Sequence, residues 1–216
     1  MGAQGGLRSD AERNRRQLVE TAKVVFAERG LGAPLDEIAR RAKVGNATLY
    51  RRFPSRGLLV AAVFADALQD VVDATERALK VEDPWEAFAE HLTFLCEAQA
   101  GNRAFADLLV AIASAVPELE SLRGRAYHGL AELIDRARAA GVLRPDFRHT
   151  DVVPVLMANA GLAERTAEHA PAAWRRQLGF TLAGLRAPGE TVDAPADHVG
   201  ILRAMHALAE RNGLAG

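Results

Sequence analysis

Apolar residues recur along this 216-residue chain at three- and four-residue intervals, the spacing that places them on one face of an α-helix. Sustained alternation of apolar and polar residues, which marks half-buried strands, is absent from the sequence. Alanine and leucine dominate, and both favour helices. The pattern therefore predicts an all-α protein.

Start and stop signals divide the chain into helical segments. Ser9 with Glu12 three residues later predicts the beginning of a first helix, and Gly30 predicts its end. Asp83 followed by Pro84 predicts another beginning, because Asp caps helices and Pro suits the first helical position. Further segments are expected at 117–141, from 150 or 151, from 170 to 187, and at 198–211. The last segment is either a packed helix or a loose tail.

The charge distribution and the helix-breaking residues near Pro54 predict two domains. After Pro54, helical spacing continues unbroken from Leu58 to about Lys80, a length of roughly 35 Å that can leave a small domain and enter a larger one. Residues 1–56 carry 12 Lys/Arg and 6 Asp/Glu, a net charge of +6, whereas residues 57–216 carry 15 and 22, a net charge of −7. We therefore expect a basic N-terminal tail and polyanion-binding domain at 1–56, and an acidic helical domain with a C-terminal tail at 57–216.

Residues 35–53, LDEIARRAKVGNATLYRRF, read as two short amphipathic helices around a tight turn. The second helix begins near Asn46 and buries Leu49 and Phe53. Its other faces carry Asn46, Ala47, Thr48, Tyr50, Arg51 and Arg52. This is a helix-turn-helix, whose second helix enters the major groove of DNA, where Arg and Asn bond guanine and adenine edges. A hairpin that only packs is the alternative, but Tyr-Arg-Arg makes a poor core.

The segment from about Ala11 to Val60 resembles the N-terminal domain of TetR-family (tetracycline-repressor-like) transcriptional regulators, above all in LDEIARRAKVGNATLYRRFPSRGLL. The resemblance implies a homodimer that binds a near-palindromic double-stranded DNA operator, represses, and is released by a small molecule. It assigns Thr48, Tyr50 and Arg56 to backbone phosphates, and Asn46, Ala47 and Arg51 to the base-reading surface. Residues 1–56 then form a three-helix DNA-binding domain, and residues 57–216 an effector-binding and dimerisation domain.

Three positions depart from the family pattern. Lys43 stands where the turn usually has glycine, so a left-handed backbone there costs roughly 1 kcal/mol, although the lysine adds a charge near the DNA. Gly45 replaces the usual serine cap of the reading helix, a change worth a few tenths of a kcal/mol. Pro34 stands where Ser or Thr is common, although it suits a helix start.

The segment at 84–100 carries the first candidates for an effector cavity. Its apolar face includes Phe88, Leu92 and Leu95, with His91 at the edge and Gln99 within the stripe. The commoner explanation for either polar residue alone is structural: a satisfied boundary histidine, and a glutamine that frays into solvent. The remaining candidates for this cavity are Phe105, Leu109, Tyr127 and Asn159. Each of them could equally be an ordinary core residue, and Asn159 could instead be a dimer contact.

Residues 152–163, VVPVLMANAGLA, are apolar on every side except at Asn159. A helix that is apolar all round is buried all round, which in a small domain indicates contact with a second subunit. Segment 171–187 has a comparable apolar stripe, and the resemblance places the dimer in a four-helix bundle built from two such helices. The interface residues expected are Val155, Leu156, Asn159, Leu162, Trp174, Leu178, Leu182 and Leu185. Asn159 is either an interface residue or an effector contact.

Other classes of function find little support in the sequence. It has no nucleophile elbow, phosphate-binding glycine loop or zinc-protease motif, so we expect no enzymatic activity, cofactor or metal. Cys96, the single cysteine, is expected to be a small core residue. No apolar run is long enough to cross a bilayer and no secretory segment begins the chain, so a cytoplasmic location and no membrane partner are expected. The alternative function is a helical small-molecule carrier or an enzyme with an incidental basic head.

Overall fold

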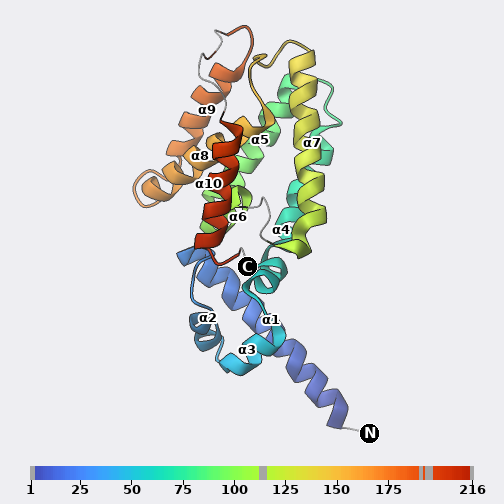
Figure 1. The fold of residues 1–216 in the computed structure, drawn as a ribbon, viewed down its shortest axis with the longest axis vertical. Coiled ribbons are helices and arrows are strands. Elements are labelled where there is room, and N and C mark those ends of the chain that lie inside the picture. Colours follow the sequence, from blue (N-terminus) through green and yellow to red (C-terminus); the bar gives the residue numbers. More distant parts are fainter. Residues whose placement is uncertain (1–2, 112–115, 190–191, 193–196, 215–216) are drawn as a thin grey trace.

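A computed structural model describes residues 3–111, 116–189, 192 and 197–214, and throughout these residues the chain is helical and without named strands. The head contains the beginning of the chain, and the body lies above it in Figure 1. The helices of the head and the junction are α1 (Ala3–Arg29), α2 (Leu35–Arg41), α3 (Asn46–Arg52) and α4 (Arg56–Ala78). Those of the body are α5 (Pro84–Ala100), α6 (Arg103–Ala111), η1 (Pro117–Leu119), α7 (Glu120–Ala139), η2 (His149–Asp151), α8 (Val152–Thr166), α9 (Ala173–Leu185) and α10 (His198–Arg211). The predicted all-α fold is confirmed.

The first helix is longer than predicted. It begins at Ala3, so Ser9 lies inside the helix and does not cap it, and the expected beginning at Ser9 is wrong. Helical backbone continues beyond the head toward the N-terminus (Figure 1). A capping-box sequence is also an ordinary i, i+3 pair within a helix, so the local signal does not exclude an earlier start. The predicted end is confirmed, because Gly30 has a positive φ of 76°.

Ion pairs fasten α2 to the end of α1. Glu37 of α2 pairs with Arg29 of α1, and it also accepts a hydrogen bond from Arg41 at 2.8 Å. Arg41 in turn reaches Glu28 of α1 at 2.7 Å. Burial alone would raise the pKa of Glu37, but the two guanidinium groups outweigh it and hold that pKa below its ordinary value. This network keeps the first helix of the helix-turn-helix at a set angle to α1.

Helix α4 connects the head to the body, and the buried core is continuous along it. Ser55 caps α4 by accepting from the Leu58 amide at 3.2 Å, and Asp83 caps α5 by accepting from the amides of Trp85 and Glu86. Leu59 and Leu68 are buried in the same core cluster, and α4 contacts α1 of the head as well as α5 and α7 of the body. One helix therefore contributes to the packing of both the head and the body.

Helices α4 and α7 pack closely at Gly129. A Cβ atom added to Gly129 would lie 2.3 Å from Cγ2 of Thr75, a distance that carbon atoms do not occupy without movement. Thr75 is buried and bonds Val71 O on its own helix at 2.8 Å. Glycine at this position therefore lets the two helices approach.

The C-terminal segment is a packed helix rather than a loose tail. Helix α10 lies against α6 (Figure 1), and Met205, Ala209 and Leu214 are buried. Asp197 caps it by accepting from the Gly200 amide at 2.7 Å. The two earlier interpretations of this segment are thereby decided in favour of the helix.

Helices α8 and α9 pack against each other on one flank of the body (Figure 1). Several residues expected at a dimer interface face their own chain instead and have almost no area left for a second subunit. These are Leu156, Asn159, Trp174, Leu178 and Leu185, each at most 9% exposed. Their assignment to a dimer interface is wrong, because the buried sides of α8 and α9 that carry them cover the core of their own subunit. Val155, Leu162 and Leu182 stay partly exposed.

Candidate nucleic-acid interface and effector core

The turn of the helix-turn-helix spans Lys43, Val44 and Gly45, as predicted. Lys43 has a left-handed backbone with φ of 54°, so the lysine occupies the conformation that glycine takes without penalty. Gly45 precedes α3 in an extended conformation without a side-chain cap. Leu49 and Phe53 are buried beneath α3, which fixes the helix on the head.

The outer surface of α3 presents the residues that the sequence assigns to DNA. Asn46, Ala47, Tyr50, Arg51 and Arg52 are exposed, as is Lys43 in the turn, while Thr48 is half-buried. Within the described part of the chain, Arg51 and Arg52 make no ion pair. Two guanidinium groups, an amide and a phenol on one exposed helix form a surface that can bond base edges and phosphates.

Arg56 is half-buried and bonds to backbone carbonyls within the protein. Its Nη1 donates to Leu31 O and Ala33 O, both at 2.7 Å, and burial lowers its pKa from the ordinary value. This guanidinium holds the loop between α1 and α2 on the beginning of α4, which is a structural role, and its assignment to a DNA phosphate stays a prediction. Sequence spacing could not reveal this, because Leu31 and Arg56 lie far apart along the chain.

Arg15 lies beside α3, a position that sequence reasoning missed. Its guanidinium carbon is 5.8 Å from the centroid of the Phe53 ring, so α1 carries a cation next to the end of the reading helix. Only the tertiary structure brings α1 next to Phe53, the residue that follows α3, and no local motif signals this contact.

A buried pair of amides joins α5 to α8. Asn159 Nδ2 donates to Gln99 Oε1 at 3.1 Å and to Cys96 O at 3.0 Å. Gln99 is 2% exposed, so the structural expectation that it frays into solvent is wrong. Gln99 Nε2 and Asn159 Oδ1 have no hydrogen-bond partner. One buried donor and one buried acceptor of this pair are therefore left without partners, each at a cost of about 1–3 kcal/mol.

His91 lies in a second buried polar contact, between α5 and α4. Its Nε2 is 3.3 Å from Thr75 Oγ1. Since the Thr75 hydroxyl donates to Val71 O, Nε2 is assigned as the donor, which leaves Nδ1 an acceptor without a partner. Burial lowers the pKa of His91 to about 4, so the ring is neutral at pH 7. The histidine is thus fully buried and only half satisfied, rather than a satisfied residue at the core boundary.

The apolar effector candidates form packed core, with one exception. Phe88, Leu92, Leu95 and Phe105 are buried, and Leu109 is half-buried. Tyr127 is 54% exposed and packs edge-on against His128, so its assignment to an internal cavity is wrong. Cys96 is fully buried and burial raises the pKa of its thiol to about 12, as a core residue requires.

The described residues contain no cluster of three or more His, Cys, Asp or Glu side chains suited to a metal ion. None of the helices in this part of the chain combines the length and apolarity needed to cross a membrane.

Two family models match the chain. Residues 18–63 match the bacterial regulatory proteins of the tetR family, and residues 83–187 match the C-terminal domain of SbtR-like transcriptional regulators. A comparison with curated proteins returned no match.

Solved structures give the same result. A TetR transcriptional regulator from Streptomyces coelicolor is 33% identical, with a TM-score of 0.50, over 81% of this chain and 99% of its own. A TetR-family regulator from Agrobacterium tumefaciens is 17% identical, with a TM-score of 0.58, over 82% of this chain and 100% of its own. A gamma-butyrolactone receptor, 16% identical, has a TM-score of 0.58 over 94% of this chain and 98% of its own. The last two show a shared fold.

The exposed reading helix, the two family models and the regulator from Streptomyces coelicolor lead to one conclusion. The chain belongs to the TetR family of bacterial transcriptional regulators, and its helix-turn-helix head is a DNA-binding domain.

Proposed function

We propose that this regulator is a homodimeric repressor that binds a near-palindromic operator and leaves it when a small, largely apolar effector enters the body. The observation that carries the DNA half of the proposal is the exposed surface of α3. Asn46, Ala47, Arg51 and the residues around them are accessible on a helix whose buried side is fixed by Leu49 and Phe53. The bases are read by Asn46, Ala47 and Arg51, and phosphates are bound by Lys43, Thr48, Tyr50 and Arg52.

The dimer is proposed to form through the outer faces of α8 and α9. Phe180 is 66% exposed on α9, where Gly179 and Ala183 also face outward and allow close approach. Val155 and Leu162 of α8 are partly exposed. A two-fold axis through this flank places two reading helices on one side of a duplex, about 34 Å or a multiple of it apart.

The effector site is proposed at the Gln99–Asn159 pair. A ligand hydroxyl accepts from Gln99 Nε2 and donates to Asn159 Oδ1, so it satisfies both unpaired atoms at once. Buried Leu95 and Cys96 on the same stretch of α5 supply apolar contacts. The dimer has two states in this proposal: one whose two heads fit the operator, and one whose heads lie too far apart to do so. The ligand releases DNA only if it binds the second state more tightly than the first.

Selection of binding sites from a pool of random duplexes tests this function. We expect an enriched motif with two related half-sites, and affinity that falls steeply as salt rises because many contacts are to phosphates. Binding without sequence enrichment would show that the head recognises DNA only by charge. No binding in low salt would contradict the proposal altogether.

A further inference from the structure

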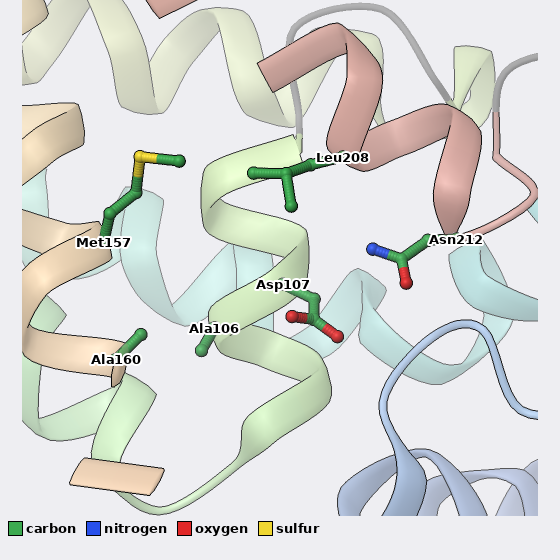
Figure 2. A pocket seen from close by; sticks show the side chains of 6 residues that line it. All are labelled: Ala106, Asp107, Met157, Ala160, Leu208 and Asn212. Carbon is green, nitrogen blue, oxygen red and sulfur yellow. The ribbon is translucent and has the colours of Figure 1, made fainter. Parts of the chain in front are cut away.

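A cavity of about 160 Å³ lies between α6, α8 and α10, apart from the Gln99–Asn159 pair (Figure 2). Ala106, Met157, Ala160 and Leu208 give it apolar walls, and Asp107 and Asn212 are its polar lining residues. Figure 2 shows Asp107 on α6 and Asn212 at the end of α10 on one side of the cavity, with Met157 and Ala160 of α8 on the other.

The two polar residues of this cavity also contact the head. Asp107 Oδ2 accepts from the Leu31 amide at 3.4 Å, in the loop between α1 and α2. Asn212 lies against the same loop, because a Cβ atom added to Gly32 would be 3.4 Å from its Oδ1. Gly213 follows with φ of 65° and lies against the Arg56 side chain, which itself holds that loop. The cavity wall and the anchorage of the helix-turn-helix are therefore made of the same residues.

We propose that this cavity is a second small-molecule site, for a one-ring amine, and that its occupant is sensed by the loop between α1 and α2. The pocket is partly open to solvent, and its volume is comparable to that of an apolar cavity of about 150 Å³ that holds benzene. Met157 and Leu208 contact the ring, while the Asp107 carboxylate accepts from the ammonium group. A carboxylate favours a cation over a neutral donor, because a charge-assisted hydrogen bond is about twice as strong as a neutral one.

The same contact explains how occupancy reaches the head. An ammonium group in the cavity competes with the Leu31 amide for Asp107, and that hydrogen bond is already long at 3.4 Å. The loop then loses one of its anchors and keeps the hydrogen bonds from Arg56 and the buried side chains of Leu31 and Ala33, so the position of α2 relative to α4 becomes less restricted. Occupancy of this site therefore loosens the head without any change at the Gln99–Asn159 pair.

Titration of the full-length protein with benzylamine, in the absence of DNA, tests the proposal. We expect saturable binding with a Kd on the order of 1 mM, as befits a fragment of this size. Benzyl alcohol, the neutral isostere, should bind roughly tenfold more weakly. Amide hydrogen exchange at Leu31 should become faster when benzylamine is bound. Absence of saturable binding, equal affinity for the alcohol, or unchanged exchange at Leu31 would each overturn the proposal.

Three variants locate the site. Asp107→Asn should lower benzylamine affinity about tenfold or more and leave benzyl alcohol affinity within about twofold. Ala160→Leu fills the cavity and should abolish binding of both compounds. Glu132→Gln removes an exposed charge on α7, and it should change neither affinity. Circular dichroism confirms that each variant is folded. If Asp107→Asn and Ala160→Leu both bind benzylamine like the unmodified protein, the ligand lies elsewhere and the proposal is wrong. The DNA-binding function does not depend on this outcome.

Discussion

Asn159 Nδ2 on α8 lies 3.1 Å from Gln99 Oε1 on α5, so one amide–amide hydrogen bond joins two helices within a mostly apolar core. A buried polar atom without a partner destabilises a protein by more than an intact hydrogen bond stabilises it. The main effect of breaking this bond is therefore the cost of the atom that is left unpaired. The pair therefore sets both the alignment of the two helices and the polarity of the proposed effector site.

Asn159→Ala should destabilise the protein by about 1–3 kcal/mol, because Gln99 Oε1 and Cys96 O lose their donor. The double variant Asn159→Leu with Gln99→Leu removes both amides and should recover most of this loss. Urea unfolding measures the free energy of unfolding of the double variant and of each of its two single Leu variants. If the losses of the two single variants add up to the loss of the double variant, the two amides are not energetically coupled.

Arg51→Ala should cost about 1–3 kcal/mol of operator affinity and relax base preference at one position in each half-site, since Arg bonds guanine edges. Tyr50→Phe should instead lower the affinity for all DNA sequences equally, because a hydroxyl–phosphate contact carries no sequence information. Repeated site selection and fluorescence titration separate the two effects. A Tyr50→Phe protein with altered base preference would contradict the roles assigned here.

His91 should make the protein less stable as the pH falls. Its pKa is about 4 in the folded protein and near 6.5 when unfolded, so between these values the unfolded chain binds more protons. Its contribution is fully present above pH 6.5 and is lost as the pH falls to 4, with a total on the order of 3 kcal/mol. Denaturant unfolding of His91→Leu at several pH values should show a shallower dependence over this range.

The matched control for that experiment is His169→Gln, because the side chain of His169 is 86% exposed. It should follow the pH dependence of the unmodified protein. If His91→Leu and His169→Gln behave alike between pH 4 and 6.5, burial of His91 is not the cause of the pH dependence.

Gly129→Ala should destabilise the protein by about 1–3 kcal/mol, because the added Cβ lies 2.3 Å from Thr75 Cγ2. Thr75→Ser removes that methyl group and keeps the hydroxyl, so it should rescue Gly129→Ala. Gly124→Ala on the same helix meets no atom within 4 Å and should stabilise the protein by about 0.5–1 kcal/mol. Thermal unfolding is measured for Gly129→Ala, Thr75→Ser, their combination and Gly124→Ala. It decides whether crowding at Gly129, rather than helix propensity, governs the stability of Gly129→Ala.

Phe180→Asp should yield a folded monomer, because Phe180 is 66% exposed on the proposed interface. Leu178→Asp should unfold the chain instead, at a cost of roughly 3 kcal/mol or more, since Leu178 is 3% exposed within its own subunit. Sedimentation measures the subunit number and circular dichroism the fold. A Phe180→Asp protein that remains dimeric would place the interface on another face.

The beginning of α1 and the bounds of α6 were not predictable from the sequence, whereas most helical segments, the turn at Lys43, the cap at Asp83 and the buried pair Leu49 and Phe53 were. Each depends on residues within a few positions of one another, where periodicity and capping chemistry act directly. The helix-turn-helix and its exposed surface are also set by residues that lie close together along the chain. That is why the DNA-binding candidates on α3 are found on the outer face, where periodicity placed them.

The tertiary structure alone decided which partner each helix face meets. Periodicity groups Trp174 with Leu178 and Leu185, but it does not tell whether that stripe covers its own core or a second subunit. It could not reveal that Asn159 faces α5, that Tyr127 faces solvent, or that Arg56 holds a loop more than twenty residues away. Those outcomes depend on how whole helices pack, and packing is set by contacts between residues that are distant along the chain.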